Sequence, residues 1–272
     1  MGIHLLQDAR RDDAPGRSAV AGITPDNRLS GVQMCRSDGE IVGAVGESPA
    51  LVLVDAPLVV PAVAGRRDVE HVLAWLDIPA FPVTPARMQK AYGGARGVHL
   101  AEALVDAGHV VAEALPDQVL RQLMWEADHP DGSPVLPLAD YRAAWLGIRA
   151  PAFRPRGGRA RNDGLAPARA LLGAAANLAA WPAPEREGDL ADLDEAAAVD
   201  AVACALLARR CLDAPGDRWA LVGDAQRGRV ALAACPEMID RAGINIARLR
   251  DEGTIAIPAE VAGAQVGPPQ SW

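Results

Sequence analysis

The feature that most constrains the fold is the apolar run Leu51-Val52-Leu53-Val54, which ends abruptly at Asp55. A continuous run of branched aliphatic residues is typical of a strand that is buried on both faces of a sheet. Half of the 272 residues are apolar, which excludes a mainly disordered chain and is enough to bury a sizeable core. The run therefore predicts a sheet flanked by helices, an α/β fold.

Shorter patterns place other elements around this strand. Before it, alternating apolar segments and a Ser37-Asp38-Gly39 turn predict three strands, at 18–23, 30–36 and 40–45. After it, residues 109–114 predict a strand, and residues 219–222 and 229–233 predict a hairpin. Helical spacing predicts the helices between them, chiefly over 66–76, 98–107, 116–125, 166–180 and 194–212. Three meandering strands followed by alternating helices and strands indicate a mixed sheet.

The domain prediction is simple. Residues 1–17 are polar and are predicted to be a flexible leader, residues 18–257 a single domain, and residues 258–272 a loose tail. No repeat and no linker between two domains is evident. The N-terminus lacks the apolar run of a signal peptide, and the most apolar stretch is too short and broken to span a bilayer. With four cysteines and no CxxC pair, we expect free thiols in a soluble cytoplasmic protein.

Three acidic residues stand out by their surroundings. Asp55 and Glu113 lie at the ends of apolar strands, and Asp200 lies within a helix of small apolar residues. A carboxylate in such a place is costly unless it is paired or binds a cation. Strand-end carboxylates that meet a helix carboxylate suit Mg²⁺ or Mn²⁺. The alternatives are a strand-end cap for Asp55, a salt bridge to an arginine for Glu113, and a solvated helix position for Asp200.

Arginines are the second group of candidates. Arg66 and Arg67 follow Asp55 closely enough to reach the same site. The segment 149–161 concentrates positive charge in a chain whose formal net charge is −8, and it includes Arg154, Arg156 and Arg159. Guanidinium groups bind phosphate, so these five arginines are predicted anion ligands. The alternative for the segment is a solvated loop. The acidic excess argues against tight, nonspecific binding to duplex DNA.

Several of these segments together resemble a family of predicted RNase H-like nucleases, domain of unknown function 429. The most specific are VDAPL followed by a GRR segment, the strand-end Glu-x-x-Pro, and the late helix VDAxxxAL. The resemblance runs from about residue 18 to residue 235. It implies an RNase H-like mixed sheet, with three antiparallel strands, parallel strands beside them and helices on both faces. It also implies that Asp55, Glu113 and Asp200 are the catalytic acids.

The sequence departs from the family pattern at two positions. The family has an Asp in the first strand, as in Gly-Ile-Asp, where this chain has Gly22-Ile23-Thr24. Asp26 lies two residues on, where strand alternation returns it to the same face, and it is the candidate replacement. The late helix often carries a second acid three residues before its Asp, where this chain has Ala197. We therefore predict metal ligands at Asp26, Asp55, Glu113 and Asp200, in a weakened centre.

The leading functional hypothesis is a metal-dependent phosphodiester hydrolase of nuclease type that uses Mg²⁺ or Mn²⁺. Its expected partner is a nucleic acid or a small phosphate-containing ligand. Two alternatives stay open: a non-catalytic binding or regulatory protein that keeps the fold, and an enzyme that acts on a small anionic metabolite in the same cleft. Thr24 and Ala197 motivate the first alternative.

Overall fold

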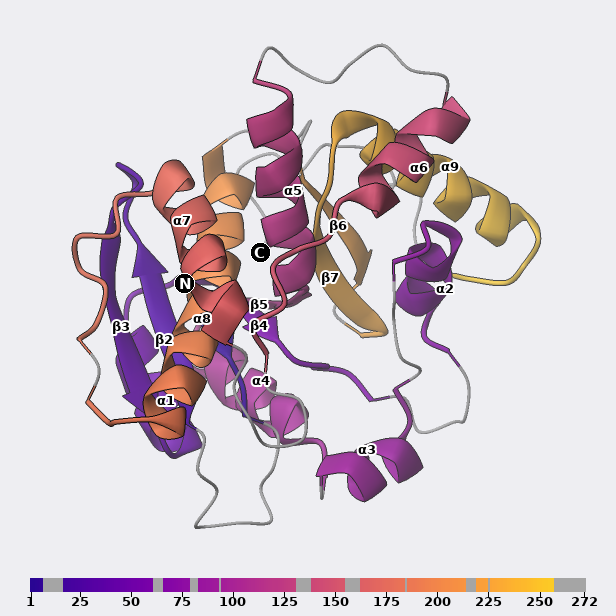
Figure 1. Cartoon of the computed structure of the whole chain (residues 1–272). Coiled ribbons are helices and arrows are strands. Elements are labelled where there is room, and N and C mark those ends of the chain that lie inside the picture. Colours follow the sequence, from indigo (N-terminus) through magenta and orange to yellow (C-terminus); the bar gives the residue numbers. More distant parts are fainter. Residues whose placement is uncertain are drawn as a thin grey trace.

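A seven-stranded mixed sheet forms the centre of the molecule (Figure 1). The computed structural model describes residues 1–6, 17–60, 66–78, 83–92, 94–130, 138–154, 162–183, 185–213, 219–224 and 226–256. Its strands are β1 (Gly2–His4), β2 (Ser18–Ile23), β3 (Leu29–Cys35), β4 (Leu51–Asp55), β5 (Val110–Ala114), β6 (Trp219–Asp224) and β7 (Gly228–Ala233). The spatial order is β3-β2-β1-β4-β5-β7-β6. Strands β1, β4, β5 and β7 are mutually parallel, and β2, β3 and β6 are attached by antiparallel pairing.

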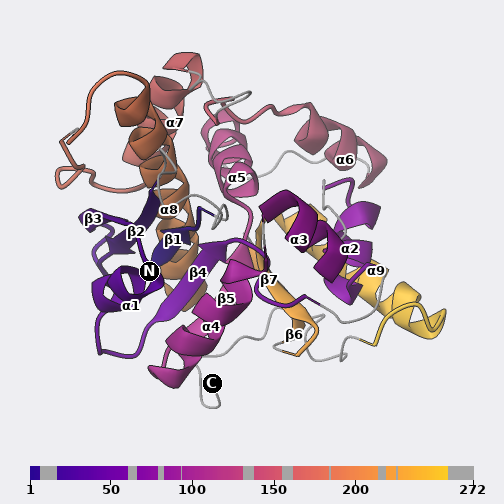
Figure 2. The same cartoon turned by 90° about the horizontal axis from the view of Figure 1, so that it is seen from below.

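Helices cover both faces of this sheet. They are α1 (Asp38–Val45), α2 (Asp68–Trp75), α3 (Pro85–Tyr92), α4 (Arg96–Asp106), α5 (Pro116–Asp128), α6 (Leu138–Gly147), α7 (Leu165–Ala175), α8 (Asp189–Asp213) and α9 (Pro236–Asp251), with a short 3-10 turn at Asn162–Gly164. Seen from below, α5, α7 and α8 lie on one side of the central strands and α1 and α4 on the other (Figure 2). Helices α2 and α9 pack together beside β6 and β7.

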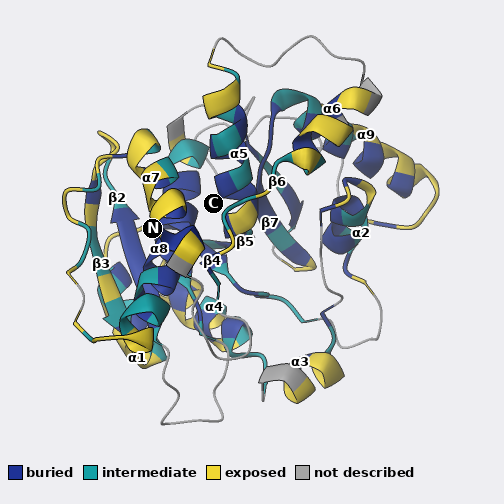
Figure 3. Cartoon of the chain, viewed as in Figure 1, coloured by how far each residue is buried: buried dark blue, intermediate teal, exposed yellow. Residues whose placement is uncertain are grey.

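The central strand confirms the strongest sequence prediction. Leu51 and Leu53 pack into the core under α5, α7 and α8, whereas Val52 and Val54 pack into the core under α1 and α4. Alternate residues of one strand thus enter two different cores, which is why all four had to be apolar. The buried residues lie mainly on the strands and on the helix faces that pack against them, whereas α3 is mostly exposed (Figure 3).

The long helix α8 is rich in alanine because it lies very close to the sheet. Fourteen consecutive residues, from 195 to 208, include seven alanines, and α8 contacts β1, β2 and β4 along its length. At Gly2 of β1, an added Cβ would lie 2.1 Å from Ala205 N and 2.2 Å from Ala201 O. Backbone passes so near to backbone there that only glycine fits.

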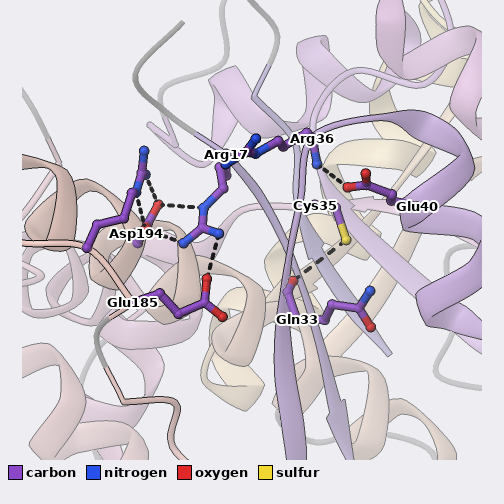
Figure 4. A network of polar contacts seen from close by, with 8 residues as sticks. Arg17, Gln33, Cys35, Arg36, Glu40, Glu185 and Asp194 are labelled. Atoms are coloured by element: carbon purple, nitrogen blue, oxygen red, sulfur yellow. Dashed lines mark hydrogen bonds and ion pairs between the residues drawn. The ribbon is translucent and has the colours of Figure 1, made fainter.

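An ion-pair network attaches the start of β2 to the region that begins α8 (Figure 4). Arg17 Nη2 lies 2.6 Å from Asp194 Oδ2, and Arg17 Nη1 lies 2.7 Å from Glu185 Oε2. Arg186 binds the same Asp194 carboxylate through Nε at 2.6 Å. Two guanidinium groups therefore hold one carboxylate of α8, which helps to set where this helix crosses the sheet.

The predicted strand over 40–45 is wrong, because these residues belong to α1. The Ser37 hydroxyl accepts a hydrogen bond from Glu40 N at 3.2 Å. The Glu40 carboxylate accepts one from Arg36 N at 2.6 Å, which Figure 4 shows. Ser-x-x-Glu is a capping pattern that starts a helix. Ile41 and Val45, four residues apart, are buried against the sheet. The apolar residues of this short segment fit both the two-residue period of a strand and the 3.6-residue period of a helix. The capping residues are what favour the helix.

The predicted flexible leader is also wrong for its first residues. Residues 2–4 form β1, which lies between β2 and β4 near the middle of the sheet. Residues 7–16 and the predicted tail at 258–272 lie outside the described residues. A strand of three residues is too short to show the alternation of apolar and polar residues by which strands are recognised in a sequence.

Among the described helices, none has both the length and the apolar character needed to cross a bilayer.

Candidate functional site

His4 and Asp55 begin the candidate site as neighbours in the sheet. Strands β1 and β4 are parallel and in a register that pairs His4 with Asp55, the last residue of each strand. Their side chains therefore lie at the same carboxyl edge. His4 Nδ1 lies 3.3 Å from Asp55 Oδ2, and the two side chains are 23% and 24% exposed.

Asp200 reaches the same point from α8. The close passage of β1 over Ala201 and Ala205 at Gly2 brings the preceding residue, Asp200, against the end of β1. Asp200 Oδ2 lies 3.3 Å from His4 Nδ1, and its side chain is only 1% exposed. The small apolar residues around Asp200 therefore pack against the sheet beneath the site, and the alternative of a solvated helix position is wrong.

Arg154 joins the cluster from the segment that follows α6. Its position is set by Phe153, which is fully buried in the core under α8. Arg154 donates to Asp200 through both Nε (2.9 Å to Oδ2) and Nη2 (2.7 Å to Oδ1), and its Nη1 lies 2.5 Å from Asp117 Oδ1 of α5. A bidentate pair of this kind fixes the plane of the carboxylate. Arg154 therefore orients Asp200.

The charges in the cluster stabilise one another. Burial alone lowers the pKa of His4, but hydrogen bonds to Asp200 and Asp55 outweigh it and raise the pKa of His4 to about 9. Burial alone raises the pKa of Asp200, but Arg154 and His4 outweigh it, and the pKa of Asp200 is lowered. At neutral pH the free site thus holds an imidazolium and a guanidinium between carboxylates.

The three side chains also have the donors of a metal site. His4, Asp55 and Asp200 each offer one ligand atom, and these atoms lie within 4.8 Å of one another. Nitrogen and carboxylate oxygen together are ligands for Mn²⁺, Zn²⁺ and related ions. An ion here would take the place that the Nδ1 proton of His4 occupies between the two carboxylates, so the residues present fit a divalent cation.

Glu113 does not join Asp55 and Asp200. In the parallel β4–β5 pair it is in register with Val54, and neighbours in register point to the same face. That face belongs to the core under α1 and α4, opposite to the face that carries Asp200. The Glu113 carboxylate instead accepts bonds from Arg67 Nη2 at 2.9 Å and from Leu58 N at 3.0 Å. The salt-bridge alternative is the one that the structure shows.

Asp26 is also distant from the site. Strands β1 and β2 are antiparallel, and His4 pairs with Ala19 whereas Gly2 pairs with Ala21. The chain after Ile23 therefore leaves the sheet at the edge opposite to His4. Asp26 is exposed there, accepts a hydrogen bond from Thr24 Oγ1 at 2.6 Å and pairs with Arg28 at 2.5 Å. As a metal ligand beside Asp55, Asp26 is a wrong prediction.

The predicted anion-binding arginines separate into three groups. Arg154 lies in the site, as described. Arg66 is exposed, and Arg67 is buried with Nε directed to Glu70 at 2.8 Å and Nη1 and Nη2 directed to Glu113. The donors of Arg67 are used inside the protein, so it is not placed to bind an external anion. Arg156 and Arg159 lie outside the described residues.

The sequence reasoning missed His4 and Asp117. His4 had a recognisable signal, because Gly2-Ile3-His4 matches the Gly-Ile-Asp pattern with histidine in the third position. The prediction instead aligned the Gly-Ile-Asp pattern with Gly22-Ile23-Thr24, at the end of the adjacent strand β2. Asp117, next to Pro116 in the first turn of α5, resembled an ordinary helix-start acid. Only its contact with Arg154 links it to the site.

Comparison of the chain with protein-family models, with curated proteins and with solved structures finds no match.

Proposed function

We propose that this protein is a metal-dependent phosphodiester hydrolase with an RNase H-like arrangement, whose centre is His4, Asp55 and Asp200. The observation that carries the proposal is the meeting of these three side chains, from two parallel strand ends and one long helix, with ligand atoms within 4.8 Å. The strand order β3-β2-β1-β4-β5, in which an antiparallel unit leads into parallel strands, agrees with the arrangement that the family resemblance implies. The expected substrate is a nucleic acid or a smaller phosphodiester.

Each residue has a definite task in this proposal. His4, Asp55 and Asp200 would hold the divalent ion, and the chemistry it would supply there is activation of water as a nucleophile near neutral pH. Arg154 keeps the Asp200 carboxylate oriented through two hydrogen bonds. All three nitrogens of Arg154 are directed to Asp200 and Asp117, so its task in the proposal is to position Asp200 and not to bind phosphate.

Hydrolysis of a simple phosphodiester tests this function. The purified chain, freed of metal with a chelator, is assayed on bis(p-nitrophenyl) phosphate and on a single-stranded oligonucleotide with added Mn²⁺, Zn²⁺ or Mg²⁺. We expect hydrolysis that depends on the ion and that falls at least about 100-fold in Asp200→Asn, because a buried ligand is lost. Asp189→Asn, at an exposed position of the same helix, is the matched control. Hydrolysis that is equal in Asp200→Asn and wild type, or absent with all three ions, would refute the proposal.

One observation favours a second candidate, a non-catalytic binding protein. Both oxygens of Asp200 already accept hydrogen bonds from Arg154, and the protonated His4 lies 3.3 Å from a carboxylate oxygen of Asp55 and of Asp200. A site whose carboxylates already have cationic partners without metal can persist as a structural ion-pair network. Calorimetry separates the two: binding of a divalent ion that requires Asp55 supports the hydrolase, and no binding at millimolar ion supports the binding protein.

A further inference from the structure

The donor set of the candidate centre is unusual in one respect, because one of its three ligand atoms is an imidazole nitrogen. Asp55 and Asp200 contribute carboxylate oxygens and His4 contributes Nδ1. Mg²⁺ is a hard cation that binds oxygen and keeps much of its water, whereas imidazole suits Mn²⁺, Zn²⁺ and the metals between them. The identity of residue 4 therefore bears on which ion the centre accepts.

Two of the three separations between the ligand atoms match those of ligands on a single ion, and the third is at most 4.8 Å. His4 Nδ1 is 3.3 Å from Asp55 Oδ2 and 3.3 Å from Asp200 Oδ2. Two ligands about 2.1 Å from one metal lie about 3.0 Å apart at octahedral angles and about 3.4 Å apart at tetrahedral angles. Little movement is needed for one ion to bind between Nδ1 and the two oxygens.

The same chemistry favours a single ion, because residue 4 is not a bridging ligand. A carboxylate has two oxygens and can bridge two metals, but Nδ1 of an imidazole has a single lone pair and binds one. The other carboxylates near the site are used elsewhere, since Glu113 pairs with Arg67 and Asp117 pairs with Arg154. Residue 197, one helical turn before Asp200, is a buried alanine. Among the described residues, a second ion thus has no bridging ligand at the end of β1.

The charges of the side chains also agree with a single divalent ion. A divalent ion neutralises Asp55 and Asp200 once His4 has released its proton. Arg154 and Asp117 balance each other beside them, at 2.5 Å. The buried Asp200 is then left with no excess charge of either sign, which a low-dielectric position requires.

We propose that this centre takes one transition-metal ion of the Mn²⁺-to-Zn²⁺ group in preference to Mg²⁺, and that His4 is the residue that determines the selection. The inference rests on the metal site of the proposed function and adds the class and the number of ions. It predicts that replacing His4 by aspartate, which supplies two hard oxygens at the same strand end, changes the selection toward Mg²⁺.

The test measures binding and spectroscopy, not activity. Calorimetry of the metal-free full-length chain with Zn²⁺, Mn²⁺ and Mg²⁺ is expected to give one ion per chain, with Zn²⁺ and Mn²⁺ at least about tenfold tighter than Mg²⁺. In His4→Asp that ratio is expected to fall by at least about tenfold. His99→Asp, at a histidine 79% exposed on α4, is the matched control and keeps the wild-type ratio.

Pulsed electron paramagnetic resonance of bound Mn²⁺ reports the ligand directly. We expect coupling to a ¹⁴N nucleus in wild type and in His99→Asp, and its loss in His4→Asp. If His4→Asp does not fold, His4→Gln also removes the imidazole nitrogen and should also lose the coupling. The wild-type spectrum tests nitrogen ligation without any variant. Absence of nitrogen coupling in wild type, two ions per chain, or Mg²⁺ bound as tightly as Mn²⁺ would overturn the inference.

Failure of this inference can be told apart from failure of the proposed function. Nitrogen-coupled binding of one ion without phosphodiester hydrolysis refutes the hydrolase and keeps the metal selection. Hydrolysis that is lost in Asp200→Asn but is supported equally by Mg²⁺ keeps the hydrolase and refutes the metal selection. No binding of any of the three ions refutes both.

Discussion

Two arginine–carboxylate clusters lie near the ends of adjacent parallel strands, on opposite faces of the sheet, and they differ in how their polar atoms are used. In the Arg67 cluster, the side chains of Arg67, Glu70 and Glu113 are 5%, 1% and 7% exposed. Their charges are met by one another and by backbone N–H groups of Leu58, Arg67 and Val83. In the His4 cluster, formed by His4, Asp55 and Asp200 with Arg154, the side chains of His4 and Asp55 are about a quarter exposed.

This difference separates a structural cluster from a candidate site. Glu70 and Glu113 hold Leu58, Arg67 and Val83 beside the sheet, because they bind the Arg67 guanidinium and the backbone N–H groups of these three residues. Asp55 and His4 make a single contact of 3.3 Å with each other and stay open to solvent. A buried carboxylate with all its bonds inside the protein contributes to folding, whereas one that shares a proton at the surface can exchange that proton for an ion.

The largest effect is expected from Arg67→Met. Removing the guanidinium leaves two carboxylates buried without a counter-charge, which costs about 3–5 kcal/mol of unfolding free energy. Urea unfolding followed by circular dichroism measures it. Arg66→Met, at the exposed neighbouring arginine, is the control and should change the unfolding free energy by less than about 0.5 kcal/mol. Equal effects of the two variants would remove the distinction between the clusters.

Asp55→Asn should separate binding from stability. We expect the affinity for Mn²⁺ or Zn²⁺ to fall about 100-fold, since one of three protein ligands is lost. The unfolding free energy should change by about 1 kcal/mol or less, because the His4–Asp55 contact is partly exposed. Calorimetry and urea unfolding measure the two quantities, with the exposed Asp106→Asn as control. A loss of stability as large as that of Arg67→Met would make Asp55 a structural residue instead.

The unfolding free energy of the metal-free chain should depend on pH through His4. The pKa of His4 is raised to about 9 in the folded protein, so its protonated form stabilises the fold. That contribution is complete below about pH 6.5 and is lost as the pH rises through about 9, a decrease of about 1–3 kcal/mol.

Urea unfolding at several pH values in the presence of a chelator measures this decrease, and His4→Gln is the control that should lack it. The difference between the two chains also removes the contribution of the Met1 amine, whose burial lowers its pKa to about 6. Identical pH profiles would show that folding does not raise the pKa of His4.

The smallest effect is expected at Asp26, the acid that the sequence pattern favoured. Asp26 is exposed at the edge of the sheet opposite to His4, paired with Arg28. Asp26→Asn should therefore leave the metal affinity and the midpoint of urea unfolding unchanged within error. A weaker metal affinity in this variant would contradict the register of β1 and β2 that places the site.

The sequence predicted those parts of the fold that local pattern controls. The run 51–54, the strand at 110–114 and the helix around Asp200 each have a long enough pattern for burial to select one period. The same signals marked Asp55 and Asp200 as costly carboxylates that needed a partner. The capping residues Ser37 and Glu40 were present as well, and they would have converted the predicted strand over 40–45 into a helix.

Only the tertiary structure decided which residues meet. Whether Glu113 faces Asp200 depends on its register with Val54, and whether Asp26 or His4 ends at the site depends on the direction in which β2 runs beside β1. Side chains alternate faces along a strand, so one step in register or one reversal of direction moves an acid to another face or another edge. The sequence alone determined that Asp55 and Asp200 need partners; the pairing of β1 and the close passage of Gly2 over α8 decided that the partner is His4.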